Sequence, residues 1–350
     1  MDKRTKILIS RMGNIGDMLF ITPLLSAIKS LIPQSDVYVL LPKYSKEVLI
    51  NNPDVDFLFT FYTKTKKFRN RLHNALILRR LKGMRFDYLL CLDTDKNVFS
   101  FLKKIPYVNL WIGFSSPAHI VKNWDEGIHA ADNYLSLLED VFPSIEIGRY
   151  RTRFTFSIPE DQKNKTKAFL LRYGLSEPIL ICPCTSQFRP SRLWPTRNWI
   201  SLIDRLLKEG NNSIIIVSRT RKEKPVPELY RHFCKKIYFW NNRSLVETAS
   251  LMSLAKAVVC LDSGTLHLST AVSGGRVISL FGPSSPVHTG PYPNNVPQFR
   301  VIQRLPKCMG PCNTFPREKI PQECLNAEYT PCMEQIDVDS VWKAIYANTG

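Results

Sequence analysis

Apolar residues follow two alternating patterns along the chain. Short apolar runs predict buried strands, and longer segments with apolar residues three or four apart predict helices. In the first half, strands are predicted at 6–9, 37–41, 57–61 and 88–92, and helices at 17–31, 44–50 and 68–81. In the second half, strands are predicted at 179–182, 213–217, 257–261 and 277–281, and helices at 162–173, 199–209, 245–254 and 266–272. This alternation is typical of parallel sheets covered by helices on both faces.

A polar, basic stretch at 148–165 separates the two halves. We therefore expect an α/β protein with two Rossmann-like, doubly wound domains facing across a cleft, at residues 1–155 and 156–335. A last helix is expected at 336–350, with the N-terminal domain as a candidate surface for it to pack on. Such sheets bind ligands beyond the carboxyl ends of their strands, so the functional residues are expected in the loops that follow the strands.

The composition is that of a folded protein that stays in the cytoplasm. Hydrophobic residues make up 44% of the chain, which excludes disordered and fibrous proteins. No apolar run approaches the roughly 18 residues of a membrane span, and the apolar run near the N-terminus is too short for a signal peptide. The net charge of +18 is spread over both halves and predicts a polyanionic partner, such as nucleic acid, an anionic membrane or a phosphorylated substrate.

The loop after the first predicted strand combines two glycines with a carboxylate. Gly13 and Gly16 allow a tight turn and a close approach to a ligand, with Asn14 between them. Asp17 at the start of the following helix would repel a phosphate, and the loop lacks the dinucleotide-binding pattern Gly-x-Gly-x-x-Gly. Asp17 is therefore either a helix-start residue favoured by the helix dipole or a general base facing the cleft. In the second case, the loop residues Gly13, Asn14 and Gly16 are expected to bind the acceptor.

A second loop, after the strand at 257–261, has the features of an anion site. The hydroxyls of Ser263 and Thr265 lie beside a helix start at Gly264, where backbone N–H groups and the helix dipole favour a phosphate. His267, one turn into the helix, is either a phosphate ligand or a buried histidine. Asp262 is expected to orient its neighbours within this donor-binding loop.

Two further loops follow strands of the second half. Arg189 and Arg192 precede Pro195, which suits the first turn of a helix. Guanidinium groups match diphosphate oxygens, so these arginines are either donor ligands or part of a solvated basic loop. The loop at 281–292 is rich in Gly, Pro, Ser and Thr, and is either a rigid hydroxyl-bearing wall of the site or a structural turn.

The four loops together carry a resemblance that none carries alone. They read Gly-x-x-Gly-Asp at 13–17, Arg-x-Trp-Pro at 192–195, Asp-Ser-Gly-x-x-His at 262–267 and Phe-Gly-Pro-Ser-x-Pro at 281–286. This order resembles glycosyltransferase family nine, the bacterial heptosyltransferases of lipopolysaccharide core assembly. The resemblance spans roughly residues 5–345 and is most specific in the last two motifs.

The resemblance implies a GT-B fold whose N-terminal domain binds the acceptor and whose C-terminal domain binds the nucleotide-sugar donor. It implies an inverting transfer of a heptose from ADP-heptose to a hydroxyl of the lipopolysaccharide inner core, with no metal or other cofactor. Asp17 matches the family's general base, and Ser263, Gly264 and His267 match its donor-phosphate loop. Arg192 stands where the family commonly has Lys, a change that keeps the charge but alters the geometry. The expected protein is a monomer on the cytoplasmic face of the inner membrane, without a nucleic-acid partner.

Nine Lys and Arg residues lie between 61 and 85, without one Asp or Glu. Phe68, Leu72, Leu76 and Leu81 give this segment a partial apolar face. A basic amphipathic helix favours an anionic membrane surface, and the phosphates of the lipid A or core acceptor are an equal target for Lys64, Lys66, Lys67 and Arg69. An ordinary solvated helix face is the remaining interpretation.

Four late cysteines, Cys308, Cys312, Cys324 and Cys332, are candidates for a zinc site, reduced structural thiols or disulfides. Their spacing lacks the close pairs of common zinc sites, and no metal ligand is assigned.

Three other functions compete with the heptosyltransferase. The first is a glycosyltransferase with another nucleotide-sugar donor, and the second is a non-catalytic polyanion-binding protein. The third is a nucleotide-linked oxidoreductase, which the absent Gly-x-Gly-x-x-Gly pattern disfavours.

Overall fold

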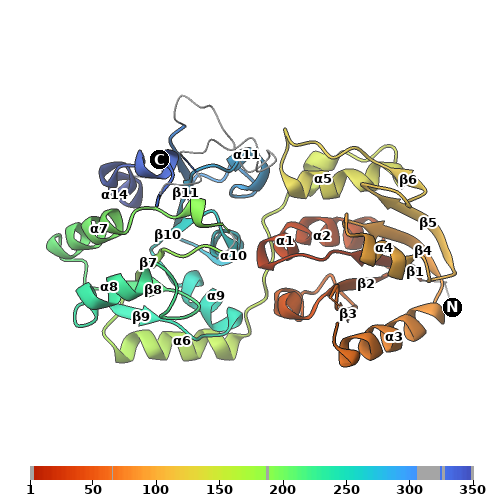
Figure 1. The fold of residues 1–350 in the computed structure, drawn as a ribbon, viewed down its shortest axis with the longest axis horizontal. Coiled ribbons are helices and arrows are strands. Elements are labelled where there is room, and N and C mark those ends of the chain that lie inside the picture. Colours follow the sequence, from red (N-terminus) through yellow and green to blue (C-terminus); the bar gives the residue numbers. More distant parts are fainter. Residues whose placement is uncertain (1–3, 65, 187–188, 306–323, 325–327, 348–350) are drawn as a thin grey trace. The chain divides into compact units, whose positions relative to one another are not determined.

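The computed structural model describes residues 4–64, 66–186, 189–305, 324 and 328–347. The chain divides into two compact units, Met1–Ser157 and Ile158–Gly350. Each unit is built on its own six-stranded sheet, and every strand pair in both sheets is parallel (Figure 1).

The first sheet has the strand order β3-β2-β1-β4-β5-β6. Its strands are β1 (Thr5–Ser10), β2 (Ser35–Pro42), β3 (Phe57–Phe61), β4 (Phe86–Cys91), β5 (Val108–Gly113) and β6 (Ile120–Val121). Its helices are α1 (Ile15–Phe20), α2 (Thr22–Leu31), α3 (Phe68–Lys82), α4 (Lys96–Leu102) and α5 (Ala130–Ser136). Three short 3₁₀ helices complete the unit: η1 (Lys43–Val48), η2 (Leu137–Asp140) and η3 (Ile147–Tyr150).

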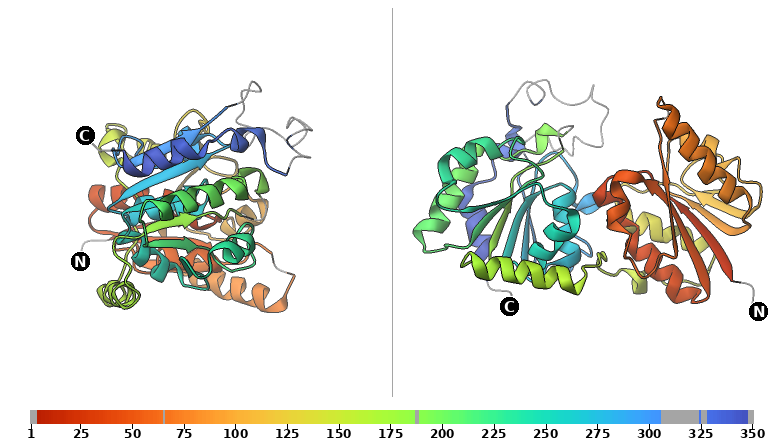
Figure 2. Two further views of the ribbon diagram at one scale, coloured as in Figure 1. Left: turned by 90° about the vertical axis from the view of Figure 1, so that its left-hand side faces the viewer. Right: turned by 90° about the horizontal axis from the view of Figure 1, so that it is seen from below.

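Helices cover both faces of the first sheet, as the apolar runs predict. On one face, α3 and α4 bury Ile77, Leu81 and Val98 against strand residues such as Leu40 and Leu89. On the other face, α2 packs with α5 (Figures 1 and 2). The central strand β1 is therefore covered on both sides, and its carboxyl end opens directly into the loop that carries Asp17.

Two elements of the first unit differ from the sequence prediction. The helix expected at 17–31 is two helices that meet at Ile21, because Pro23, in the first turn of the second helix, lacks the N–H that a continuous helix needs. The segment expected to form an α-helix at 44–50 is the 3₁₀ helix η1.

The second sheet has the order β12-β11-β10-β7-β8-β9. Its strands are β7 (Ile179–Cys182), β8 (Ile214–Val217), β9 (Tyr238–Trp240), β10 (Ala257–Leu261), β11 (Arg276–Phe281) and β12 (Phe299–Gln303). The helices are α6 (Glu160–Arg172), α7 (Thr196–Lys208), α8 (Val226–Phe233), α9 (Leu245–Ser253), α10 (Gly264–Val272), α11 (Pro286–Thr289), α13 (Pro331–Glu334) and α14 (Val338–Tyr346), with the 3₁₀ helix η4 (Pro190–Arg192).

The last helix, α14, belongs to the second unit. Its Val341 and Ile345 are buried in the same apolar cluster as Ile278 and Leu280 of β11. The apolar face of α14 is used within the second unit, against α7 and β11, and the expected packing of this helix on the N-terminal domain stays a prediction.

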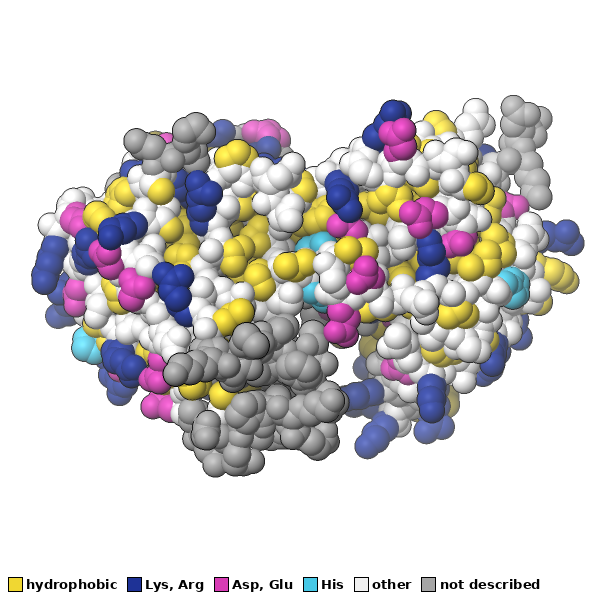
Figure 3. Space-filling model, turned by 90° about the horizontal axis from the view of Figure 1, so that it is seen from above, with side chains coloured by type: hydrophobic (Ala, Val, Ile, Leu, Met, Phe, Trp, Pro, Cys, Tyr) yellow, Lys and Arg dark blue, Asp and Glu magenta, His cyan; other side chains and the backbone are white. Residues whose placement is uncertain are grey.

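Charged side chains lie on the surface of both units. On the face drawn in Figure 3, Lys and Arg side chains are interspersed with Asp and Glu on each unit. Within the described parts of the chain, no helix is both long enough and apolar enough to cross a membrane.

Candidate active site

Asp17 lies just beyond the carboxyl end of β1, as the third residue of α1. Its Oδ1 accepts a hydrogen bond from Nη2 of Arg11 at 2.5 Å, and its Oδ2 accepts one from the backbone N–H of Asn14 at 2.8 Å. The side chain is 30% exposed. The carboxylate is therefore held in one orientation while part of it stays accessible to a substrate.

Arg11 is itself fixed by neighbours from three elements. Its Nη1 donates to the backbone oxygen of Leu92 at 3.1 Å, and its guanidinium lies 5.6 Å from the ring centroid of Tyr134. Burial opposes the charge, but Tyr134, Asp17 and Asp93 together raise the pKa of Arg11 above its ordinary value. Arg11 therefore stays cationic behind Asp17.

Asp93 holds the loop from the neighbouring strand. It follows β4 and is buried, where its carboxylate accepts from the hydroxyl of Ser10 at 2.6 Å and from the backbone N–H of Met12 at 2.5 Å. Burial raises the pKa of Asp93, and Arg11 and Ser10 oppose that rise. The buried position suits a structural role, since a general base needs contact with the substrate.

Gly13 leaves room for Asp17. A Cβ atom at position 13 would lie 2.3 Å from the Cβ of Asp17, closer than real side chains approach. The hydroxyl of Ser45 donates to the backbone oxygen of Gly13 at 3.0 Å and fixes the turn from the other side. Gly16 is buried within the first turn of α1, and Asn14 is exposed before it.

The loop after β10 forms the start of α10. Ser263 is the residue before the helix, and its hydroxyl lies 2.7 Å from that of Thr265. The Ser263 side chain makes no capping hydrogen bond to the helix. Backbone N–H groups at such a helix start favour an anion. His267 is buried one turn further into the helix.

A buried carboxylate joins three loops beside this helix start. Asp262 is 1% exposed. Nη1 of Arg192 donates to its backbone oxygen and lies 3.0 Å from its Oδ2, and the hydroxyl of Ser284 donates to the same Oδ2. Burial raises the pKa of Asp262, and Arg192 and Ser284 oppose that rise. Asp262 thus places a cation and a hydroxyl next to Ser263.

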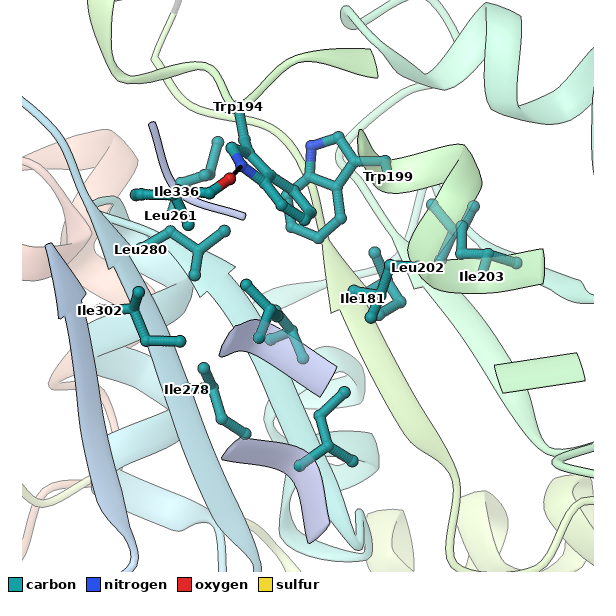
Figure 4. Close-up of a cluster of buried hydrophobic side chains, with 14 of the residues drawn as sticks. Ile181, Trp194, Trp199, Leu202, Ile203, Leu261, Ile278, Leu280, Ile302 and Ile336 are labelled. Carbon is teal, nitrogen blue, oxygen red and sulfur yellow. Dashed lines mark hydrogen bonds between the residues drawn. The ribbon is translucent and has the colours of Figure 1, made fainter. Parts of the chain in front are cut away.

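The backbone on either side of this cluster is anchored in the core. Trp194, two residues after Arg192, is fully buried and donates from Nε1 to the backbone oxygen of Ile336 at 2.9 Å (Figure 4). Its ring meets that of Trp199 edge-on, with centroids 4.7 Å apart. Arg189, three residues before Arg192, is exposed.

Gln303 is a residue of this region that the sequence patterns missed. It ends β12, and its amide nitrogen donates to the backbone oxygens of Gly282 and Ser284 at 3.0 and 2.9 Å. Gln303 therefore fixes the loop at 282–284, whose Ser284 side chain bonds Asp262. An isolated glutamine near the end of an edge strand gives no sequence pattern that would identify it.

The predicted residues thus fall into three groups. In the first unit, Asp17 lies with the residues that orient it, Arg11 and Asn14. In the second unit, the candidate donor residues lie near Asp262. The basic residues Lys64, Lys66 and Lys67 are exposed in the connection from β3 to α3, and Arg69 is exposed in the first turn of α3.

The cysteine cluster is only partly covered by the structure. Cys324 and Cys332 are reduced, whereas Cys308 and Cys312 lie outside the described residues. Among the residues that are described, no three or more His, Cys, Asp or Glu side chains form a group that could hold a metal ion.

The family model of glycosyltransferase family 9 (heptosyltransferase) matches residues 77–315. The chain belongs to this family. The protein is therefore a glycosyltransferase, and the predicted resemblance to the heptosyltransferase family is confirmed. The matched range includes the second unit's loops but begins after Asp17, so the role of Asp17 rests on its own geometry.

Relatives of this glycosyltransferase span almost the whole chain. It is 26% identical over 329 residues to lipooligosaccharide heptosyltransferase 2 of Haemophilus influenzae, covering 85% of this chain and 89% of that protein. A family 9 glycosyl transferase from Veillonella parvula has the same fold, with a TM-score of 0.82 at 19% identity over 99% of this chain and 98% of its own. The E. coli ADP-heptose lipopolysaccharide heptosyltransferase II matches with a TM-score of 0.74, also at 19% identity, over 98% of each chain. The expected GT-B-type α/β fold is thereby confirmed.

Proposed function

We propose that this glycosyltransferase moves a heptose from ADP-heptose to a hydroxyl of the lipopolysaccharide inner core, with inversion at the anomeric carbon. Family membership supports a heptose donor, and the named relatives act in lipooligosaccharide or lipopolysaccharide assembly. The observation that carries the proposal is the carboxylate of Asp17, fixed by Arg11 and Asn14 at the end of β1 yet still accessible.

In the proposed reaction, Asp17 acts as the general base. Its carboxylate accepts the proton of the acceptor hydroxyl as that oxygen bonds to the anomeric carbon of the heptose. The bond from the anomeric carbon to the β-phosphate oxygen breaks, and ADP leaves with the electron pair. A single displacement of this kind inverts the anomeric configuration. Gly13, Asn14 and Gly16 line the acceptor side of Asp17 in this proposal.

The second unit stabilises the leaving diphosphate. Negative charge grows on the β-phosphate during transfer, and preorganised donors lower the barrier most where charge develops. The backbone N–H groups of Gly264 and Thr265, the hydroxyl of Ser263 and the cation of Arg192 are grouped at one helix start. Arg189 adds a second, exposed cation, and His267 lies one turn away. These groups supply the positive potential without a required metal ion or other cofactor.

The cations of Arg192 and Arg189 are not equivalent. Arg192 shares its charge with the buried carboxylate of Asp262, so the pair brings little net charge to the phosphate. Its contribution is a guanidinium of fixed orientation. The exposed Arg189 and the helix start therefore carry most of the net positive potential in this proposal.

The proposal includes a peripheral location on the cytoplasmic face of the inner membrane and a monomeric enzyme. Core oligosaccharide is attached to lipid A, so the acceptor hydroxyl is presented at a phosphate-rich surface. Lys64, Lys66, Lys67 and Arg69 are exposed cations suited to such phosphates. No nucleic-acid partner enters the proposal.

A transfer assay tests the proposal. Purified protein is incubated with ADP-heptose and heptose-deficient core oligosaccharide, with and without EDTA, and the product is analysed by mass spectrometry and NMR. We expect the gain of one heptosyl residue, release of ADP, an inverted anomeric centre and no loss of activity with EDTA. Transfer from another nucleotide sugar in place of ADP-heptose would reject the proposed donor, and dependence on a divalent cation would reject the metal-free step.

A further inference from the structure

The helix α3 turns three large apolar side chains to solvent. Phe68 is 76% exposed, Leu72 is 51% exposed and Leu76 is 54% exposed. The partial apolar face expected from the sequence therefore divides: Leu81 joins the core, whereas the other three residues do not. In α7, by contrast, the large apolar residues Trp199, Leu202, Ile203 and Leu206 are buried.

The opposite side of α3 is firmly attached to the sheet. Ile77 and Leu81 pack in the cluster with Phe59 and Phe61 of β3. The side chain of Asn74 is buried and bonds both the N–H and the C=O of Tyr62, at 3.1 and 2.9 Å. The exposure of Phe68, Leu72 and Leu76 is therefore set by the attachment of the other side of α3 to the sheet. Figures 1 and 2 show where the ribbon of α3 lies on the first unit.

The three exposed residues form a stripe with cations along both edges. Residues four apart lie on one side of a helix, so Phe68, Leu72 and Leu76 form a row about 12 Å long. At about 100° per residue, Arg71 and Lys82 fall along one edge of the row and Arg69 and Arg80 along the other, whereas Arg79 lies within it. All five of these cations are exposed.

The segment that carries the stripe has charges of one sign. Residues 61–85 contain nine Lys or Arg and no acid, whereas acids and bases are interspersed over the face drawn in Figure 3. A second copy of the same stripe would bring like charges together and be repelled. An anionic bilayer satisfies both features, because its interface accepts Phe and Leu side chains while its phosphates attract the flanking cations.

We propose that α3 docks on an anionic phospholipid bilayer, with Phe68, Leu72 and Leu76 inserted below the phosphates and the flanking Arg and Lys residues at phosphate level. The proposal deepens the peripheral membrane location given above and rests on it. The helix lies in the plane of the interface, because its opposite side is covered by the sheet along its length. Binding therefore needs both the apolar row and the cations.

The test separates insertion from charge attraction. Flotation of the full chain with phosphatidylethanolamine–phosphatidylglycerol vesicles is compared with flotation with phosphatidylcholine vesicles. The triple variant Phe68→Ser, Leu72→Ser, Leu76→Ser keeps every charge, and we expect it to bind anionic vesicles at least tenfold more weakly. The variant Arg79→Gln, Arg80→Gln, Lys82→Gln keeps the apolar row. As salt is raised, this variant should dissociate from the vesicles at a lower salt concentration than the wild type does.

A matched control uses equally exposed aliphatic residues elsewhere. Ile50→Ser, Leu171→Ser, Leu305→Ser removes side chains that are 52%, 83% and 51% exposed, and it should float like the wild type. Hydrogen exchange in α3 should slow on vesicles, with no change in α6. Unaltered flotation of the Phe68/Leu72/Leu76 variant would overturn the proposal.

Two other partners of the α3 stripe, lipid A and a second copy of the chain, would give different results in these experiments. If the wild type floats only when lipid A is added, the surface recognises the acceptor and not phospholipid. If sedimentation shows a dimer that the stripe variant abolishes, and flotation is unaltered, the row is a self-association face. Transfer to a core oligosaccharide without lipid A is measured in parallel: its failure in the wild type counts against the transferase proposal, whereas the flotation result alone decides the docking proposal.

Discussion

Arg11 and Asp17, six residues apart, form an ion pair of 2.5 Å at the carboxyl end of β1. The loop that carries the pair is fixed by Asp93, which accepts hydrogen bonds from Ser10 and Met12. Arg11 accounts for one hydrogen bond to Oδ1 of Asp17, and Asn14 for one to Oδ2. Each carboxylate oxygen has a further acceptor site, so the pair orients the carboxylate without using up its capacity to accept a proton.

Asp17→Asn is the most direct test of the base. The amide keeps the size of the side chain and removes its basicity, so kcat should fall by at least about 100-fold, within the usual range for a lost general base. ADP affinity should change by no more than a few-fold, because the candidate donor residues belong to the second unit. Steady-state kinetics with isothermal titration of ADP checks both values. A kcat near that of the wild type would place the base elsewhere.

Arg11 is predicted to act through Asp17 as a positioning residue. Arg11→Ala should lower kcat about tenfold or more with little change in the KM for ADP-heptose, because a misplaced base loses its favourable geometry. Arg11→Lys keeps the charge but not the guanidinium fork, and it should recover part of the rate. Equal loss in both variants, together with a large fall in Tm, would indicate that Arg11 only supports the fold.

Gly13→Ala should disturb Asp17 by contact. The added Cβ would lie 2.3 Å from the Cβ of Asp17, so the loop or the carboxylate must move. A displacement of about 1 Å in a catalytic group can cost about 100-fold in rate, and we expect kcat to fall by that order with ADP affinity preserved. Gly148→Ala is the matched control, since its Cβ would meet nothing within 4 Å. Similar kinetics for the two variants would contradict the role given to Gly13.

The β-α alternation made the parallel sheets predictable, because strands buried on both faces are continuously apolar. The predicted α3 was confirmed as a helix, whereas the burial of its polar residue Asn74 was not anticipated. Asn74 is buried, because its side chain satisfies the backbone of Tyr62, and Phe68 is exposed. A pattern that treats every polar residue as exposed cannot anticipate such a hydrogen-bonded asparagine.

The loops of the site were visible in the sequence, whereas their supports were not. The contact of Met12 with Asp93 joins residues 81 positions apart, through the pairing of β1 with β4. Gln303 reaches Ser284 through the pairing of β11 with β12. These contacts depend on strand order and register, which the local pattern of apolar residues does not determine.

Arg192 can act as a ligand of the donor or as a counterion of Asp262, and the two roles predict different KM values for ADP-heptose. As a donor ligand, it contacts the diphosphate, and Arg192→Ala should raise the KM for ADP-heptose and lower kcat by more than tenfold. As a counterion, it only neutralises the buried Asp262. The single variant cannot separate the two, because removing one partner of a buried pair leaves an unpaired charge that costs about 3–5 kcal/mol.

The double variant Arg192→Ala, Asp262→Asn separates them. Replacing the carboxylate by an amide removes the unpaired charge while leaving a group that can still bond Ser284, so Tm should recover much of the loss seen with Arg192→Ala. If Arg192 binds the diphosphate, the KM for ADP-heptose stays high in this stable double variant. Arg189→Ala, at an exposed position, should raise the same KM without lowering Tm. Recovery of both Tm and KM in the double variant would show that Arg192 serves Asp262 alone, and the helix start at Ser263 with Arg189 would then remain as the phosphate-binding group.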